Sequence, residues 1–125
     1  MARFYLEGHY EEDKDLHAKV RQQIQMLLPK QRCSLEQVAL ILGLHARTLQ
    51  RRLASDSVEF EQIVEQVRYR QARHLLQHTQ LTIPQIALEL GYRSAPSFYR
   101  AHYRWFDCTP IENRQRLNSK SAAID

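Results

Sequence analysis

Residues 82–92 read Thr-Ile-Pro-Gln-Ile-Ala-Leu-Glu-Leu-Gly-Tyr, and residues 34–44 read Ser-Leu-Glu-Gln-Val-Ala-Leu-Ile-Leu-Gly-Leu. The two stretches share one pattern: a helix-capping hydroxyl residue, an apolar helical stripe with a central alanine, and a glycine. Ser34 and Thr82 each have a glutamine three residues later, which is typical of a capping box. The glycine supplies the left-handed residue that ends such a helix. The repeat therefore predicts two copies of one helical unit.

A second amphipathic helix follows the glycine in each copy, which gives each copy the pattern of a helix-turn-helix. The two units are expected at about 34–54 and about 82–106, with one extra residue after the turn in the second. Arg51 then corresponds to Arg100. Two ordinary helical hairpins with coincident caps would give the same pattern, but an arginine-bearing second helix in both copies favours DNA binding.

An apolar stripe between the units predicts a long helix over about 58–78. About 21 residues at 1.5 Å each span roughly 32 Å, close to the roughly 34 Å between successive major-groove faces of B-DNA. Such a helix has the length to hold two recognition helices in adjacent major grooves. This arrangement is a hypothesis that places both second helices on one side of a duplex.

The remaining helices flank these units. A stripe over about 15–28 predicts a helix that Pro29 ends, and a capping box at Thr109 opens a short seventh helix. No strand pattern competes, so the expected fold is all-α with seven helices, two helix-turn-helix units and a central helix. We expect residues 1–14 to be a linker, residues 15–117 the domain, and residues 118–125 a frayed tail.

The charge of the chain is uneven. Residues 1–15 hold five of the 14 acidic residues and two of the 18 basic ones, so residues 16–125 carry a net charge of +7. A basic body favours polyanions. No apolar run is long enough to span a membrane, no signal peptide is evident, and the two cysteines lack zinc-site spacing. These features predict a soluble cytoplasmic protein, associated with the nucleoid.

A family resemblance rests on residues 91–110, Gly-Tyr-Arg-Ser-Ala-Pro-Ser-Phe-Tyr-Arg-Ala-His-Tyr-Arg-Trp-Phe-Asp-Cys-Thr-Pro, followed by Arg114. In the first half the matching residues are Leu49 to Leu53, Phe60, Arg68 and Ala72. This two-part pattern resembles the C-terminal signature of the AraC/XylS family of bacterial transcription regulators. The resemblance implies sequence-specific binding of double-stranded DNA for transcription regulation.

The chain departs from the family pattern at four positions. His102 stands where phenylalanine is usual, Tyr103 where lysine is common, Asp107 where glycine is frequent and Asn113 where tyrosine is frequent. Because His102 falls on an apolar helix face, we expect a core histidine rather than a ligand. Aspartate tolerates the left-handed conformation better than most residues, so the turn at Asp107 is expected to survive.

Base-reading residues are expected in the first turns of both second helices, because these turns meet base edges in a helix-turn-helix. Arginine pairs bidentately with guanine and glutamine with adenine, whereas alanine and proline offer apolar contact to a thymine methyl. The predicted base contacts are Arg47, Gln50, Arg51, Ala95, Pro96, Ser97, Tyr99 and Arg100. Tyr99 either packs or touches a phosphate.

Phosphate contacts are expected from two further kinds of residue. Ser34 and Thr82 cap helices whose first-turn N–H groups suit a phosphate. Arg52 and Arg104 serve either phosphates or acidic neighbours.

No enzyme motif is present, so we expect no enzymatic activity, no cofactor and no metal site. His74 and His78 have metal-like spacing but no evident third ligand. By resemblance, the expected partners are double-stranded DNA, RNA polymerase and an N-terminal effector or dimerisation domain that this chain lacks. The alternative is a helical protein-interaction module without DNA binding, which would need an exposed apolar groove and no basic face.

Overall fold

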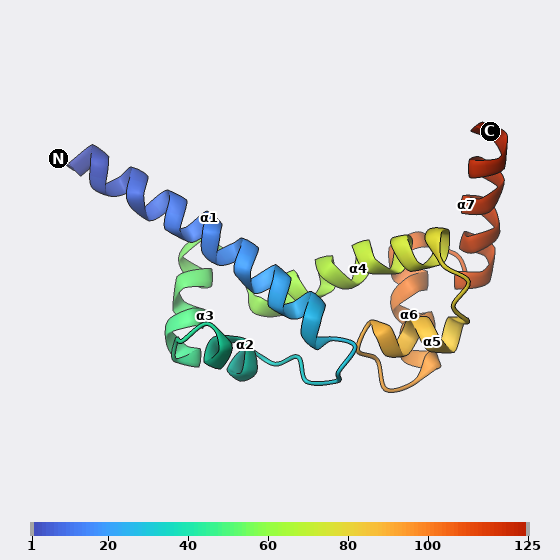
Figure 1. Cartoon of the computed structure of the whole chain (residues 1–125), viewed down its shortest axis with the longest axis horizontal. Coiled ribbons are helices and arrows are strands. Elements are labelled where there is room, and N and C mark those ends of the chain that lie inside the picture. Colours follow the sequence, from blue (N-terminus) through green and yellow to red (C-terminus); the bar gives the residue numbers. More distant parts are fainter. Residues whose placement is uncertain (1, 125) are drawn as a thin grey trace.

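The computed structural model describes the backbone of residues 2–124 and the side chains of residues 14–119. Within these residues the chain forms seven helices and no strand, which confirms the all-α fold. The helices are α1 (Ala2–Leu27), α2 (Leu35–Ile41), α3 (Ala46–Ser55), α4 (Phe60–His78), α5 (Ile83–Glu89), α6 (Ala95–Phe106) and α7 (Pro110–Ile124). Figure 1 shows α2 and α3 at one end of α4, and α5 and α6 at the other.

Two separate cores lie along α4. The first gathers buried side chains of α1, α2, α3 and the N-terminal half of α4, and it ends at Val67. The second starts at Ala72 and gathers α5 and α6, with Phe98 completely buried. Between them, residues 68–71 of α4 contribute no buried residue to either core. The central helix α4 therefore contributes buried side chains to the cores of both units.

The turn after the first helix of each unit follows the prediction from glycine. Gly43 has φ 73° and Gly91 has φ 84°, a region that side chains disfavour. Two backbone bonds close each turn, and the longer-range ones are Leu44 N–H to the Ala39 carbonyl at 2.9 Å and Tyr92 N–H to the Ala87 carbonyl at 3.0 Å. Both turns are Schellman motifs, which satisfy the last carbonyls of a helix.

The predicted N-caps are also present. The hydroxyl of Ser34 accepts from the Gln37 N–H at 3.1 Å. Thr82 forms the complete capping box, since its hydroxyl accepts from the Gln85 N–H at 3.2 Å and the Gln85 side chain accepts from the Thr82 N–H at 2.8 Å. A further capping box, between Glu59 and Gln62, sets the start of α4, two residues after the predicted start.

Two segments outside the predicted helices are helical in the structure. Residues 2–14, expected as a linker, belong to α1, and residues 118–124, expected as a frayed tail, belong to α7. Packing fixes the helices at residues 16–27 and 110–117, and extending an existing helix avoids the cost of nucleation. Neither extension contains a proline. The ends of both segments, Met1 and Asp125, lie outside the described residues.

The end of α6 confirms two expectations. Asp107 ends the helix in the left-handed conformation, with φ 57°. His102 is completely buried and packs edge-on against Phe98. It is a core histidine, as its place on the apolar face predicted.

Candidate nucleic-acid interface

The helix α3 divides cleanly into a buried and an exposed face. Leu49 and Leu53 lie in the first core, at most 1% exposed. The predicted base readers Arg47, Gln50 and Arg51 are all exposed on the other face. Arg52 is half-buried. This face therefore presents two guanidinium groups and one amide, which are suited to reading base edges.

The helix α6 repeats this division with different chemistry. Phe98, Ala101 and His102 are buried, while the predicted contacts Pro96, Tyr99 and Arg100 are exposed and Ala95 and Ser97 are half-buried. The guanidinium of Arg100 donates to the Ser97 hydroxyl at 3.3 Å, and that hydroxyl lies 3.1 Å from the Ser94 hydroxyl. Ser97 thus orients Arg100 along the helix surface, a role that the sequence pattern did not indicate.

The first turns of α3 and α6 differ from those of α2 and α5. No side chain caps the N-terminus of α3 at His45 or of α6 at Ser94, whereas Ser34 and Thr82 cap α2 and α5. An uncapped first turn leaves backbone N–H groups for solvent or an anion. The hydroxyls of Ser34 and Thr82 are already engaged as caps, so a phosphate there would meet only the remaining N–H groups.

Arg104 lies against an acidic neighbour, which was one of its two expected roles. Its guanidinium forms a salt bridge with the carboxylate of Glu65 on α4, and the indole N–H of Trp105 donates to the same oxygen at 2.7 Å. Burial alone would raise the pKa of Glu65, but these two hydrogen bonds and the charges of Arg104 and Arg68 outweigh it and lower that pKa. The Glu65 carboxylate therefore stays ionised and holds Arg104 on α4.

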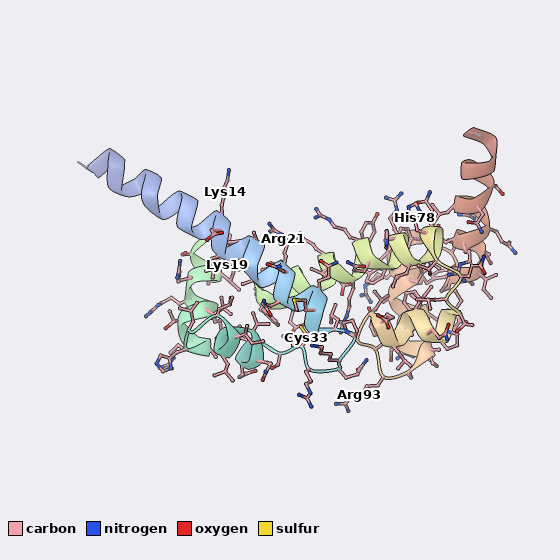
Figure 2. All side chains as sticks on the ribbon, viewed as in Figure 1. Lys14, Lys19, Arg21, Cys33, His78 and Arg93 are labelled. Atoms are coloured by element: carbon pink, nitrogen blue, oxygen red, sulfur yellow. The ribbon has the colours of Figure 1, made fainter. Side chains whose placement is uncertain are left out.

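Sequence reasoning assigned no role near the second turn to Arg93 or Gln31, and it singled out Arg68 only as part of the family pattern. Arg93 is exposed, and Figure 2 shows its side chain pointing away from the body at the loop before α6. Gln31 and Arg68 bond to carbonyls of this same turn. The basic character of Arg93 was the one available signal, whereas the contacts of Gln31 and Arg68 depend on tertiary structure.

The described part of the chain also bears on metal binding, thiol reactivity and membrane insertion. It holds no group of three His, Cys, Asp or Glu side chains able to bind a metal ion. Burial raises the pKa of the Cys33 thiol to about 11, so this group is protonated and a poor nucleophile. None of the described helices is both long and apolar enough to cross a bilayer.

Comparison with known proteins also identifies a helix-turn-helix domain. A family profile described as a helix-turn-helix domain matches residues 38–116. The HTH-type transcriptional regulator VirS of Mycobacterium tuberculosis is 39% identical over 88% of this chain. This chain belongs to the AraC family of helix-turn-helix regulators. The AraC-family relative VirS is named as a transcriptional regulator.

Two solved structures agree with the AraC fold. The transcriptional regulator CdpR of Pseudomonas aeruginosa superposes with a TM-score of 0.63 and 36% identity, covering 77% of this chain and 31% of CdpR. The DNA-binding domain of AdpA, solved in complex with a target DNA, superposes with a TM-score of 0.67 over 83% of this chain and 94% of that one. At 22% sequence identity, the similarity to the AdpA domain establishes only that the two domains share a fold. The chain spans about a third of the length of VirS.

Proposed function

We propose that α3 and α6 enter adjacent major grooves on one face of a DNA duplex. The observation that carries this proposal is the exposure of Arg51 and Arg100 at equivalent positions of the two units. The 19 residues of α4 span about 28 Å, of the same order as the roughly 34 Å between groove faces. In Figure 1 α2 and α5 lie below the two ends of α4, which is compatible with a single DNA-binding face.

The two units divide the reading of the site. In the first, Arg47, Gln50 and Arg51 form hydrogen bonds with base edges. In the second, Arg100 is the main base reader, with apolar contacts from Ala95 and Pro96 to thymine methyls and a further contact from Tyr99. Ser97 holds Arg100 in place and borders the bases.

Phosphates bind around these helices and fix their register. Arg52, Arg93 and the uncapped first turns of α3 and α6 provide donors, and the first turns after Ser34 and Thr82 add N–H groups. Arg104 reaches a phosphate when it leaves Glu65.

Selection of duplexes from a random pool, followed by sequencing, identifies the site. On that site Arg51→Ala and Arg100→Ala each weaken binding by about 1–3 kcal/mol and relax base preference at one position. Arg116→Ala removes the same charge from an exposed position of α7 and serves as the control. If both recognition variants bind like the control, the assignment of α3 and α6 to the grooves is wrong.

We also infer the setting in which this domain works. The matched length of VirS leaves two thirds of that relative outside the similarity, which supports an N-terminal effector or dimerisation domain in the full-length protein. From the role of a bacterial regulator we infer that the protein contacts RNA polymerase and lies in the cytoplasm, associated with the nucleoid. The same role involves no enzymatic activity. Co-purification of the full-length protein with RNA polymerase on a promoter fragment tests this inference.

A further inference from the structure

The loop between α1 and α2 lies directly on the turn of the second helix-turn-helix. The side-chain amide of Gln31 donates to the Leu88 carbonyl at 3.0 Å and to the Tyr92 carbonyl at 3.5 Å. These carbonyls lie in and just beyond the last turn of α5. A residue of the loop before the first unit therefore binds the backbone of the second unit, 57 and 61 positions away.

The approach of the two backbones is closest at Gly91. A Cβ atom on Gly91 would lie 2.8 Å from the Leu28 side chain and 3.2 Å from the Leu28 carbonyl oxygen, both tighter than ordinary contact. At Gly43, the equivalent turn residue of the first unit, a Cβ would meet nothing within 4 Å. Both glycines have positive φ. The close approach is therefore specific to Gly91 and is not a requirement of the turn itself.

Arg68 completes the contact from α4. Its Nε donates to the Leu90 carbonyl at 2.8 Å, and its guanidinium lies 4.5 Å from the centre of the Tyr92 ring. A cation at the C-terminal end of α5 complements the helix dipole, and the stack over the ring adds a cation–π interaction. Arg68 directly follows Val67, the last α4 residue of the first core.

These contacts bear on how the two units are oriented. The cores are separate, and α4 is the element that they share. If α4 alone joined the units, bending or twisting of this helix would change their relative orientation. A second connection between the units limits their rotation about α4. We define the junction as Leu28, Gln31, Arg68, Gly91 and Tyr92.

We propose that the junction fixes the angle between α3 and α6 and so sets the spacing of the two half-sites that the chain reads. This inference rests on the proposed function, since it assumes that both helices contact DNA together. Gln31, Arg68 and Gly91 are positioning residues that touch no base. When the junction is broken, each unit still binds its own half-site. The chain no longer holds α3 and α6 at one fixed spacing before it binds DNA.

Gly91→Ala is the main test, and Gly43→Ala is its matched control. Both substitutions place alanine at a positive φ, yet Gly91→Ala alone drives a methyl group into Leu28. Gln31→Asn is the second variant. Asparagine tolerates the left-handed conformation that Gln31 adopts at φ 58°, and its shorter side chain cannot span the two carbonyls. If Gly91→Ala does not fold, Gln31→Asn decides the question.

The first readout needs no DNA. Spin labels at Ala54 of α3 and Tyr103 of α6, both exposed, report the distance between the two helices in a chain with Cys33→Ser and Cys108→Ala. We expect one narrow distance distribution for the parent and for Gly43→Ala, and a broadened or shifted one for Gly91→Ala and Gln31→Asn. Unchanged distributions in the junction variants would overturn the proposal.

The second readout compares two duplexes derived from the wild-type selection, one with both half-sites and one with the second half-site alone. If breaking the junction leaves about a tenth of the molecules in the competent orientation, affinity for the two-half-site duplex falls about tenfold. Affinity for the second half-site alone stays unchanged, whereas a loss of stability in the second unit would lower it. Equal losses on both duplexes would overturn the proposal. Should the wild type select no specific duplex, the proposed function fails, and the distance measurement still decides on the junction.

Discussion

The side-chain amide nitrogen of Asn113 on α7 lies 2.9 Å from Nε2 of His102 on α6, and both residues are buried. Nδ1 of the same ring lies 2.8 Å from the Cys108 carbonyl. Since a carbonyl only accepts, Nδ1 carries the proton and Nε2 accepts from the Asn113 amide. Two of the four residues that depart from the family pattern thus form one hydrogen-bonded pair that ties α6 to α7.

Breaking this pair from one side is expected to cost stability. Asn113→Ala leaves the buried Nε2 of His102 without a donor, which lowers the free energy of unfolding by about 1–3 kcal/mol. Urea denaturation measures the loss. In a double-mutant cycle with His102→Phe, the combined loss should be smaller than the sum of the single losses, because the residues share one bond. Additive losses would show that the bond contributes nothing of its own.

The stability of the domain should fall in mild acid. Burial lowers the pKa of His102 and outweighs the opposing effect of its bond to the Cys108 carbonyl. The folded state therefore binds fewer protons than the unfolded chain below about pH 6.5, the usual His value. The free energy of unfolding decreases as pH falls through this value, until the lower pKa of the folded state is passed. Urea titrations between about pH 7.5 and 5.5 should show a flatter dependence in His102→Gln, and parallel curves would contradict the assignment.

Freeing Arg104 should strengthen non-specific DNA binding. Glu65→Gln removes the charge that holds Arg104 on α4, while its amide oxygen still accepts from Trp105. If Arg104 then reaches a phosphate, the slope of log affinity against log salt steepens by about 0.9. Glu61→Gln, exposed on the same helix, makes the same change in net charge. A slope that rises equally in both variants would exclude a phosphate contact by Arg104.

Arg114 on α7 is expected to contribute to the stability of the domain. Its guanidinium donates to three carbonyls at the end of α4: Leu76 at 3.1 Å, Leu75 at 3.4 Å and Thr79 at 3.4 Å. Bonds from a charged donor and the helix dipole both favour this arrangement. Arg114→Ala should lower the free energy of unfolding by about 1–3 kcal/mol, as measured by urea denaturation.

The comparison variant for Arg114 lies two residues further along α7. Arg116→Ala removes the same charge from an exposed side chain and should change stability by less than about 0.5 kcal/mol. Equal effects in the two variants would show that charge, and not the carbonyl bonds, accounts for the loss.

The repeat in the sequence was sufficient to predict the fold and the exposed faces of α3 and α6. Caps, glycine turns and helical periodicity are local signals, and they act within about ten residues. They placed Ser34, Thr82, Gly43 and Gly91 correctly. The base and phosphate contacts themselves stay predictions, because exposure alone does not show what a side chain binds.

What the sequence did not reveal depends on contacts between distant residues. Nothing near Gln31 indicates that its amide binds the carbonyls of Leu88 and Tyr92. The helical extension of α1 was missed for a different reason. A helix that leaves the core needs no apolar stripe, so periodicity gives no signal for residues 2–14.

The division of α4 between two cores has a consequence for protein engineering. A helix-turn-helix unit cut out as a minimal binder must keep its own half of α4, since that half forms part of its core. Hybrids that combine modules from two relatives have one natural splice point, directly after Val67. Arg68 must then travel with the C-terminal parent, and the parent that donates the α1–α2 loop must bring a residue able to reach across as Gln31 does.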